Sequence, residues 1–461
     1  MKTKITLLLA FLFLGFNFSF AQDDSEKDRE QLSIFTEYAK AKNYDAAFIP
    51  WMELRERNPK YNRAIYKYGE DILEDKIKKN TGTEKVASIN DLIKLWEQRG
   101  MYFSSKTPKG EYAAKACQLK YDNREFLNLT DLELYNCFDA AYKLDAKTFT
   151  NPKSLYTYFS LMVDLFDADK KSANDLFNKY DDIVEKIEQE VGNYSEHLNK
   201  LIAKEDAGTE LTSKEKKYKK FYESYLNAYN KISGSIDSKL GERANCSNLI
   251  PLYQKDFEEN KTNAIWLKRA VSRMFNKECT DDPLYIELVK AYDKTAPSAD
   301  TKYFVAGLLL KENKTNEALD YFKQSLDLET EAYQKSKKSY KIGLILKKKG
   351  SYGKARNYFN ESLKLNPSNG RPHLAIAAMY NVSANNCGDT NFNKRAVFWL
   401  AATEAKKAGR VDPTLKKSAA QSAANYLAKA PQTSEIFSEG NSGQTIKIGC
   451  WIQRSVTVPK L

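Results

Sequence analysis

Histidine is almost absent from this chain of 461 residues, which contains only His197 and His373. With so few histidines, a His-based catalytic triad and a metal site with several histidines are nearly excluded. The motifs G-x-S-x-G, G-x-x-x-x-G-K-S/T, G-x-G-x-x-G and H-E-x-x-H are missing too. Acidic pairs such as Asp181-Asp182 are common in helices and would need a cleft to act as a glycosidase dyad. We therefore expect no catalytic residues, no metal site and no cofactor.

Long apolar runs are missing as well, except at the N-terminus. Lys2 and Lys4 precede an apolar run at 5–16 that is too short to span a bilayer, and 19–21 has the small-residue pattern of a signal cleavage site. We expect cleavage before Gln22, and no cysteine follows that point as a lipoprotein would require. Since no later run reaches about 18 apolar residues, the mature chain is expected to be soluble, without a transmembrane segment, in the periplasm.

Cysteine is scarce, with six residues and no C-x-x-C pair. The missing pair argues against zinc and thioredoxin-like redox sites. In an exported protein, cysteines indicate disulfides rather than metal ligands. The order along the chain predicts three local pairs, which are Cys117 with Cys137, Cys246 with Cys279, and Cys387 with Cys450.

Acidic residues are fewer than basic ones, and the formal net charge is +12. Cleavage of the signal peptide would remove Lys2 and Lys4 and lower the net charge to +10. A basic chain suits nucleic acid, an anionic membrane surface or an acidic protein. Export makes nucleic acid the least fitting of these partners, so we expect none. The alternative is that the lysines simply solvate helix faces.

Helical periodicity is present almost throughout, and its clearest pattern is at 349–367, KGSYGKARNYFNESLKLNP. A small residue allows two antiparallel helices to approach closely, an aromatic residue one turn later fills the next layer, glycine makes the turn and proline ends the helix. This is the spacing of the second half of a tetratricopeptide (TPR) repeat. The residues that carry it are Gly350, Tyr352, Ala355, Phe359, Ser362 and Pro367.

Further copies of the pattern occur at 43–59, at 313–328 and, with an expanded turn, at 371–408. The step from Ala318 to Ala355 is 37 residues, against a standard period of about 34. We therefore predict an all-α, TPR-like solenoid of helical hairpins, a fold whose usual product is a binding surface.

Two segments depart from the repeats. Residues 171–240 carry two long apolar stripes separated by a polar break at 205–212, which predicts a long antiparallel helical hairpin. This hairpin either projects from the solenoid as an arm that reaches a partner or continues the solenoid as an ordinary helix pair. Residues 445–458 alternate and are β-branched, which predicts a short β-strand or hairpin docked on helices. The expected division is a signal peptide at 1–21, degenerate TPR-like helices at 22–170, the long hairpin at 171–240, a TPR domain at 241–430 and a tail at 431–461.

The inner faces of TPR helices line a groove, and the repeat register predicts which side chains enter it. With Gly343 at the eighth position of its repeat, the inward positions form a basic groove with two tyrosines, suited to an acidic extended segment or helix. A solvated basic face is the alternative. The clamp that holds a C-terminal carboxylate through asparagine is not supported, since Gly307, Leu344 and Ala378 occupy its positions. The predicted groove residues are Tyr303, Lys311, Lys337, Tyr340, Lys347, Lys348 and Arg371.

More specific stretches are CSNLIPLYQKDFEENKTNAIWLKRAVSRMFNKEC at 246–279, NNCGDTNF before KRAVFWLA, and the tail IGCWI. In these stretches residues 240–460 resemble a largely uncharacterised family of exported TPR proteins from Gram-negative bacteria. The resemblance implies a periplasmic location and a protein-binding role, and it brings no catalytic residues.

These observations predict a periplasmic adaptor or scaffold that binds protein partners in a cell-envelope complex for assembly, export or secretion. One alternative is a glycan- or peptidoglycan-binding module, for which Trp451 and the tyrosines would be stacking platforms. A second alternative is an enzyme with an unrecognised site.

Overall fold

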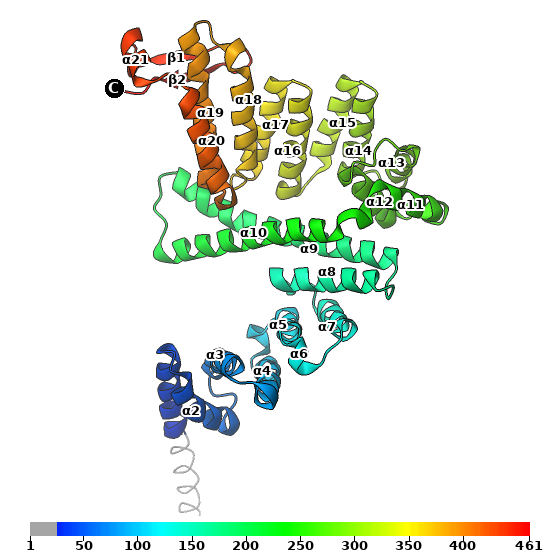
Figure 1. Ribbon diagram of the computed structural model, residues 1–461, viewed down its shortest axis with the longest axis vertical. Helices are drawn as coiled ribbons and strands as arrows, with labels where there is room; N and C mark the ends of the chain where they lie inside the picture. The colour runs from blue at the N-terminus through cyan, green and yellow to red at the C-terminus, as the bar shows by residue number, and fades with distance from the viewer. Residues whose placement is uncertain (1–24) are drawn as a thin grey trace, which may run out of the picture. The chain divides into compact units, whose positions relative to one another are not determined.

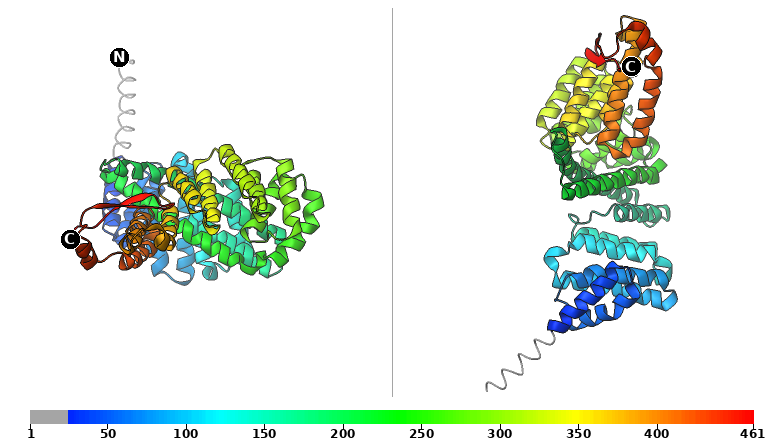
Figure 2. Two further views of the ribbon diagram at one scale, coloured as in Figure 1. Left: turned by 90° about the horizontal axis from the view of Figure 1, so that it is seen from above. Right: turned by 90° about the vertical axis from the view of Figure 1, so that its left-hand side faces the viewer.

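The computed structural model describes residues 25–461, so the expected signal peptide at 1–21 lies outside the described residues. The chain forms two compact units, Met1–Lys179 and Tyr180–Leu461. In the described part of the chain both units are built from helices, and one two-stranded sheet lies near the C-terminus (Figures 1 and 2). The expected all-α class is therefore confirmed, and the finer domain boundaries at 170, 240 and 430 stay predictions.

The first unit is a series of short helices joined by tight turns. Asparagine and threonine caps begin several of them, as at Thr130, where a capping box with Glu133 satisfies the first turn of its helix. The bounds are a helix over residues 25–40, α2 Tyr44–Arg57, α3 Ala64–Lys79, α4 Gly82–Tyr102, η1 Ser104–Lys106, α5 Lys109–Asp122, α6 Arg124–Leu127, α7 Asp131–Leu144 and α8 Pro152–Asp167.

The TPR-like pattern at 43–59 forms α2, and its aromatic residue is at the centre of the first core. Trp51 is fully buried and donates its indole N–H to the carbonyl oxygen of Ile65 at 2.8 Å. A Cβ atom at Gly69 on α3 would lie 2.6 Å from the Trp51 ring. Only glycine therefore allows α2 and α3 to approach this closely.

A partly buried polar network organises the end of the first unit. The Tyr158 hydroxyl donates to Asp139, and the Lys179 ammonium donates to the Tyr158 oxygen. Asp139 also pairs with Lys143 at 2.7 Å and with Lys179 at 3.2 Å. Burial alone would raise the pKa of Asp139, but hydrogen bonds from Lys143 and Tyr158 and the charge of Lys179 lower it to about 2.

The second unit contains a long hairpin, a row of repeat helices and a β tail. Helix α9 begins in the first unit and continues into the second. The bounds are α9 Ala173–Asp206, α10 Ser213–Leu240, η2 Gly241–Ala244, α11 Cys246–Asn260, α12 Ala264–Asn276, α13 Pro283–Thr295, α14 Ala299–Lys311, α15 Thr315–Leu328, α16 Ala332–Lys348, α17 Tyr352–Leu365, α18 Arg371–Cys387, α19 Asn391–Val411, η3 Pro413–Leu415, α20 Lys416–Lys429, α21 Thr433–Glu439, β1 Thr445–Ile448 and β2 Arg454–Thr457.

Helices α16 and α17 form the repeat that the pattern at 349–367 predicts. Ala355 and Phe359 are fully buried, and a Cβ atom at Gly343 on α16 would lie 2.6 Å from the Phe359 ring. Gly350 has a φ of +74° in the turn between the two helices, a conformation that glycine adopts without strain. The small residues thus have the structural roles that the TPR spacing assigns to them.

Neighbouring pairs repeat this packing and stand side by side in Figure 1. Ala318 and Phe322 are fully buried in the pair α14–α15, where Asn313 takes the left-handed turn position with a φ of +61°. In the pair α18–α19 the equivalent Ala396 is fully buried. The expected TPR-like solenoid is confirmed by these helix pairs.

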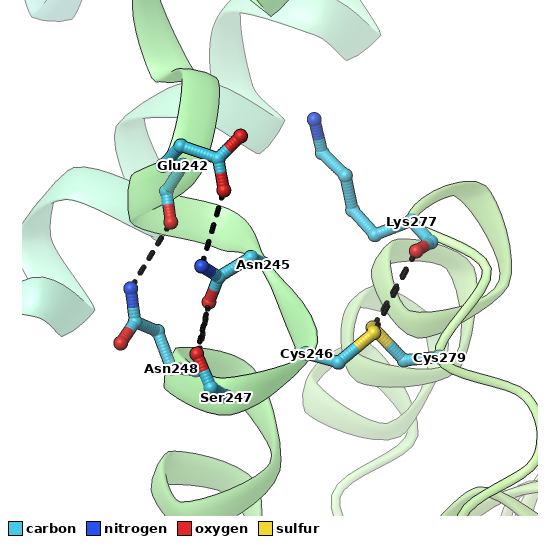
Figure 3. The surroundings of a disulfide bond; sticks show 7 residues. All are labelled: Glu242, Asn245, Cys246, Ser247, Asn248, Lys277 and Cys279. Carbon is cyan, nitrogen blue, oxygen red and sulfur yellow. Dashed lines mark hydrogen bonds between the residues drawn. A yellow bond between two sulfur atoms is a disulfide. The ribbon is translucent and has the colours of Figure 1, made fainter.

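The six cysteines form the three pairs that their order along the chain predicts. Figure 3 shows the Cys246–Cys279 bond, which joins the first residue of α11 to the turn after α12. Asn245 precedes it as the cap of α11, and its side-chain oxygen accepts from the Asn248 N–H at 3.0 Å. The Asn248 amide in turn donates to the Glu242 carbonyl oxygen at 3.0 Å. The disulfide thus lies beside a helix start that Asn245 caps.

The tail is a β-hairpin, in line with its alternating sequence. Strand β1 pairs with β2 in antiparallel register, with Ile448 opposite Arg454. The apolar Ile448 and Val458 are fully buried, and the Cys387–Cys450 bond links the hairpin turn to the end of α18. The hairpin is therefore held by both covalent and apolar contacts.

Candidate functional site

Helix α9 runs across the repeat helices of the second unit (Figure 1), and polar side chains join them. Acidic residues at 181, 182, 185 and 188 lie on one side of α9, because 185 is three or four positions after the first two and three before the last. Basic residues of α12 and α16 face this side. We call the groove that helices α12, α14, α16 and α18 line, and in which α9 lies, the inner groove.

Two arginines of α12 bind the first turns of this acidic side. Arg273, which is 5 % exposed, forms a close ion pair with Asp181. Arg269 donates to Asp182 at 2.8 Å. Burial raises the pKa of Asp181 to about 6, and the charges of the two arginines oppose this effect. The contact is therefore tight and largely shielded from water.

Further along α9, contacts continue as far as the loop before α18. Lys337 of α16 pairs with Glu188 at 2.6 Å. The Asn199 side chain donates to the Asn366 side-chain oxygen at 3.1 Å and accepts from the Ser368 N–H at 3.0 Å. Helix α9 is thus bound to the repeats along most of its length, and we call these contacts the α9 clamp. The sequence predicts that an acidic segment of a partner binds in the groove. In the structure α9, an acidic helix of the same chain, already lies there.

The clamp leaves two cavities in the inner groove. One, of about 440 Å³, is lined by residues of α9, α12, α14 and α16, and a second, of about 310 Å³, is lined by residues of α9, α10, α16 and the loop before α18. Lys337 and Lys341, one helical turn apart on α16, line both cavities. Both cavities therefore border these two lysines.

The structure brings four of the seven predicted groove residues to these cavities. Tyr303 lines the larger cavity, Tyr340 and Arg371 line the smaller one, and Lys337 lines both. The Tyr303 ring is mostly covered, since it is 5 % exposed and packs on its aromatic neighbours.

The other three predicted residues line neither cavity. Lys311 pairs with the exposed Asp281 at 2.5 Å. Lys347 and Lys348 are at the C-terminal end of α16, beyond the residues that line the cavities.

Lys341 is the groove residue that the sequence interpretation missed. In the described part of the chain no carboxylate lies within 4 Å of its ammonium group, and the nearest recorded partner is the Phe275 ring, with 6.0 Å to its centroid. Burial and the neighbouring charge of Lys337 lower the pKa of Lys341, against the opposing effect of Glu188. The four-residue spacing from Lys337 places both on one face of α16 and could have identified it.

Trp451, the stacking platform expected of a glycan-binding module, packs within the protein. Its ring lies 5.5 Å from the rings of Tyr352 and Tyr380, and the Arg356 guanidinium lies 5.3 Å from its centroid. Its indole N–H donates to Ser383 at 3.0 Å. These contacts dock the β tail on α17 and α18 and leave little of the ring for a sugar.

The two histidines are engaged separately. The His373 ring lies 2.6 Å from a carboxylate oxygen of Glu404, and the His197 ring stacks on Tyr222 at 5.4 Å. Among residues 25–461 no group of three or more potential metal ligands is found. In the same part of the chain no helix is both long and apolar enough to cross a membrane.

Comparison with known proteins gives no family assignment. No family model matches the chain. No curated protein matches it either.

Solved structures with a similar arrangement include repeat proteins of several kinds. A tetratricopeptide repeat protein from Parabacteroides merdae is 10 % identical, with a TM-score of 0.25 over 68 % of this chain and 97 % of that chain. The human IFIT1 dimer with PPP-AAAA is 13 % identical, with a TM-score of 0.32 over 77 % and 76 %. Yeast Tom70 is 12 % identical, with a TM-score of 0.27 over 89 % and 91 %. Scores this low carry no conclusion about partners, and the fold assignment rests on the helix pairs themselves.

Proposed function

We propose that the protein is an exported TPR-type scaffold whose inner groove holds an acidic segment of a protein partner in a cell-envelope complex. The observation that carries the proposal is the pair of cavities that Lys337 and Lys341 both line. Lys337 is neutralised by Glu188, whereas Lys341 has no carboxylate partner among the described residues. A partly buried ammonium group without a counter-ion favours an incoming anion.

The volume of the two cavities limits which part of a partner can enter them. Because α9 already fills the groove, about 440 Å³ and about 310 Å³ remain, which suits side chains of an extended segment rather than another helix. A carboxylate that reaches Lys341 would gain a charge-assisted hydrogen bond, and Tyr340 and Arg371 line the adjoining cavity. The partner is therefore an extended acidic peptide that contacts both α9 and α16.

Export is the second part of the proposal. Three disulfides are the usual mark of an oxidising compartment. The N-terminal signal pattern favours export from the cytoplasm. The resemblance of residues 240–460 to exported TPR proteins of Gram-negative bacteria favours the periplasm.

The test compares two lysines of the same helix. Lys341→Met removes the charge in the groove, and Lys348→Met removes an exposed charge of α16 that lies outside both cavities. Partners are captured from crosslinked envelopes and identified by mass spectrometry, and the affinity of the purified partner is then measured at low and high salt. We expect Lys341→Met to weaken binding about tenfold or more, since a hydrogen bond to a charged group contributes about 1.5–3 kcal/mol.

Lys348→Met should leave the affinity unchanged, and binding by the wild type should weaken as salt rises. Equal affinities for both variants would show that the inner groove is not the partner site. Lys341→Arg keeps the charge and should retain binding, which separates loss of charge from altered packing.

A further inference from the structure

The first turns of α10 carry an unusual concentration of lysine and aromatic residues. Residues 213–222, SKEKKYKKFY, contain five lysines and three aromatic residues and no arginine. A capping box between Thr212 and Glu215 begins the helix, and Glu215 also pairs with Lys204 of α9. The segment is therefore an ordered helix and not a flexible basic tail.

Only part of this charge is neutralised within the protein. Lys216 pairs with Glu210 and Lys219 with Glu205, each at 2.7 Å. In the described part of the chain Lys214, Lys217 and Lys220 have no carboxylate within ion-pair distance. All three are exposed, so three positive charges of one short segment face solvent.

Two aromatic side chains lie among these three lysines. Tyr218 is 46 % exposed and Phe221 is 44 % exposed. Tyr218 stacks on Tyr222 at 6.2 Å, and Phe221 contacts Tyr225 at 4.7 Å. The exposed rings are therefore held from beneath by other aromatic side chains and do not depend on a partner for their position.

The helical spacing places these residues together. Positions 214, 217, 218 and 221 are three, four and seven residues apart and share one face of α10. Lys220 lies three residues after Lys217, at the edge of that face. We call Lys214, Lys217, Tyr218, Lys220 and Phe221 the α10 basic-aromatic face.

The chemistry of this face distinguishes between anionic partners. Lysine is a flexible point charge, whereas arginine binds carboxylates through two fixed hydrogen bonds, and α10 contains no arginine. Lysines with long flexible stems suit a fluid surface of phosphate groups, and a tyrosine or phenylalanine beside them suits the headgroup layer of a bilayer. Clusters of four or more lysines on one helix are typical of segments that bind anionic lipid.

We infer that the α10 basic-aromatic face docks the protein on a membrane surface rich in anionic lipid. The lysine ammonium groups contact lipid phosphates, and the Tyr218 and Phe221 rings enter the headgroup layer. The inference does not depend on the inner groove, because none of these five residues lines either cavity.

The experiment measures co-sedimentation with vesicles of phosphatidylcholine, with and without phosphatidylglycerol at 30 mole per cent. The protein begins at Gln22 in every sample, so that the apolar residues 5–16 cannot enter lipid. The test variant is Lys214→Glu with Lys217→Glu and Lys220→Glu. We expect it to lower the partition coefficient on anionic vesicles about a hundredfold, since each lysine near such a surface contributes about a factor of five.

A matched control changes net charge by the same amount elsewhere. It replaces the exposed Lys354, Lys364 and Lys406 by Glu and should bind within about threefold of wild type. For the rings, Tyr218→Ser with Phe221→Ser should weaken binding even at high salt. Phe437→Ser, at a residue of α21 that is 75 % exposed, is the control for that pair. Circular dichroism checks that each variant is folded.

Three outcomes would overturn the inference. The wild type could bind neutral and anionic vesicles equally, or the test and control variants could bind anionic vesicles equally. The third is that wild type binds poly-glutamate but no vesicle, and the test variant loses that binding, which would assign the face to an acidic protein.

Discussion

At the scale of single residues, helices α16 and α17 pack so closely that one added methyl group would force them apart. A Cβ atom at Gly343 would lie 2.6 Å from the Phe359 ring, so only glycine fits there. Ala355, on the same helix as Phe359, is fully buried. Space at such a contact cannot expand without moving a whole helix, because protein interiors are close-packed.

We predict that Ala355→Leu destabilises the second unit by about 1–3 kcal/mol, since extra methylenes in a packed contact force neighbouring side chains and backbone to shift. Urea unfolding followed by circular dichroism measures the effect. Ala424→Leu, at an exposed position of α20, is the matched control and should change stability by less than about 0.5 kcal/mol. Equal midpoints for the two variants would contradict the repeat register assigned to Ala355.

Asp139 gives a residue-scale prediction for pH. Its pKa in the folded protein is about 2, below the value of about 3.9 for an unfolded chain. The stability that its network contributes is therefore present above pH 4 and is lost as pH falls from about 4 toward 2. Because the carboxylate is partly exposed, we expect this loss to be about 1 kcal/mol.

Hydrogen exchange of the α7 and α8 amides, measured between pH 5 and 2 and corrected for intrinsic rates, checks this expectation. Asp139→Asn should remove part of the acid-induced rise in exchange, whereas Glu125→Gln, at an exposed site of α6, should not. An unchanged pH profile in Asp139→Asn would mean that the network does not hold this carboxyl ionised.

At the scale of elements, helix α9 of the long hairpin packs on two different partners. An apolar stripe allows it to pair with α10, and an acidic side allows it to pair with the repeats. The aromatic ladder between α9 and α10 includes the Tyr194–Tyr225 contact at 5.2 Å, and the α9 clamp adds Arg273, Arg269 and Lys337 on the other side. The hairpin is thus an internal support of the solenoid and not a projecting arm.

We predict that Arg273→Ala loosens the α9 clamp, because it leaves Asp181 buried without its closest counter-charge. Removal of one partner of a buried ion pair costs about 3–5 kcal/mol when the other stays charged, and uptake of a proton by Asp181 would lower that cost. Hydrogen exchange should rise in residues 180–200 of α9. Lys200→Ala, which breaks an exposed pair with Glu196 on the same helix, should leave exchange unchanged within a few tenths of a kcal/mol.

If Arg273→Ala left exchange in α9 at wild-type rates, the clamp would not stabilise the hairpin. The apolar stripe alone would then account for its position. Arg273→Lys keeps a charge without the guanidinium geometry and should give an intermediate result.

At the scale of the whole molecule, three disulfides and the packed repeat pairs stabilise a protein that we propose is exported. One disulfide lies in the first unit and two in the second. Each closes a loop of 20 to 63 residues, which restricts the unfolded chain. A scaffold with a fixed groove and a separate basic-aromatic face would be able to hold a protein partner close to a membrane surface.

We predict that the protein isolated from the cell envelope begins at Gln22. N-terminal sequencing and intact mass should both show the loss of residues 1–21, and osmotic shock should release the protein with periplasmic markers. A product that retains Met1, or one confined to the cytoplasmic fraction, would contradict the export proposal. Free thiols at most of the six cysteines in the isolated protein would contradict it as well.

The sequence by itself determined the helical class and the repeats, because local spacing encodes both. Ala355, Phe359 and Gly350 occupy their expected places since packing period and turn conformation depend on neighbouring residues. The cysteine pairs also follow chain order. The first two join segments that neighbouring helices bring together, and Cys387–Cys450 joins the end of α18 to the turn of the β-hairpin.

Only the tertiary structure decided what fills the groove. The inward positions of α16 follow from the register, but the pairing of Lys337 with Glu188 joins residues 149 positions apart. No local pattern specifies such a contact, since it depends on the direction in which the hairpin folds back. The same long-range packing leaves the Lys341 ammonium group more than 4 Å from every carboxylate of residues 25–461. The residues available to partners were thus decided by the position of α9 on the repeats.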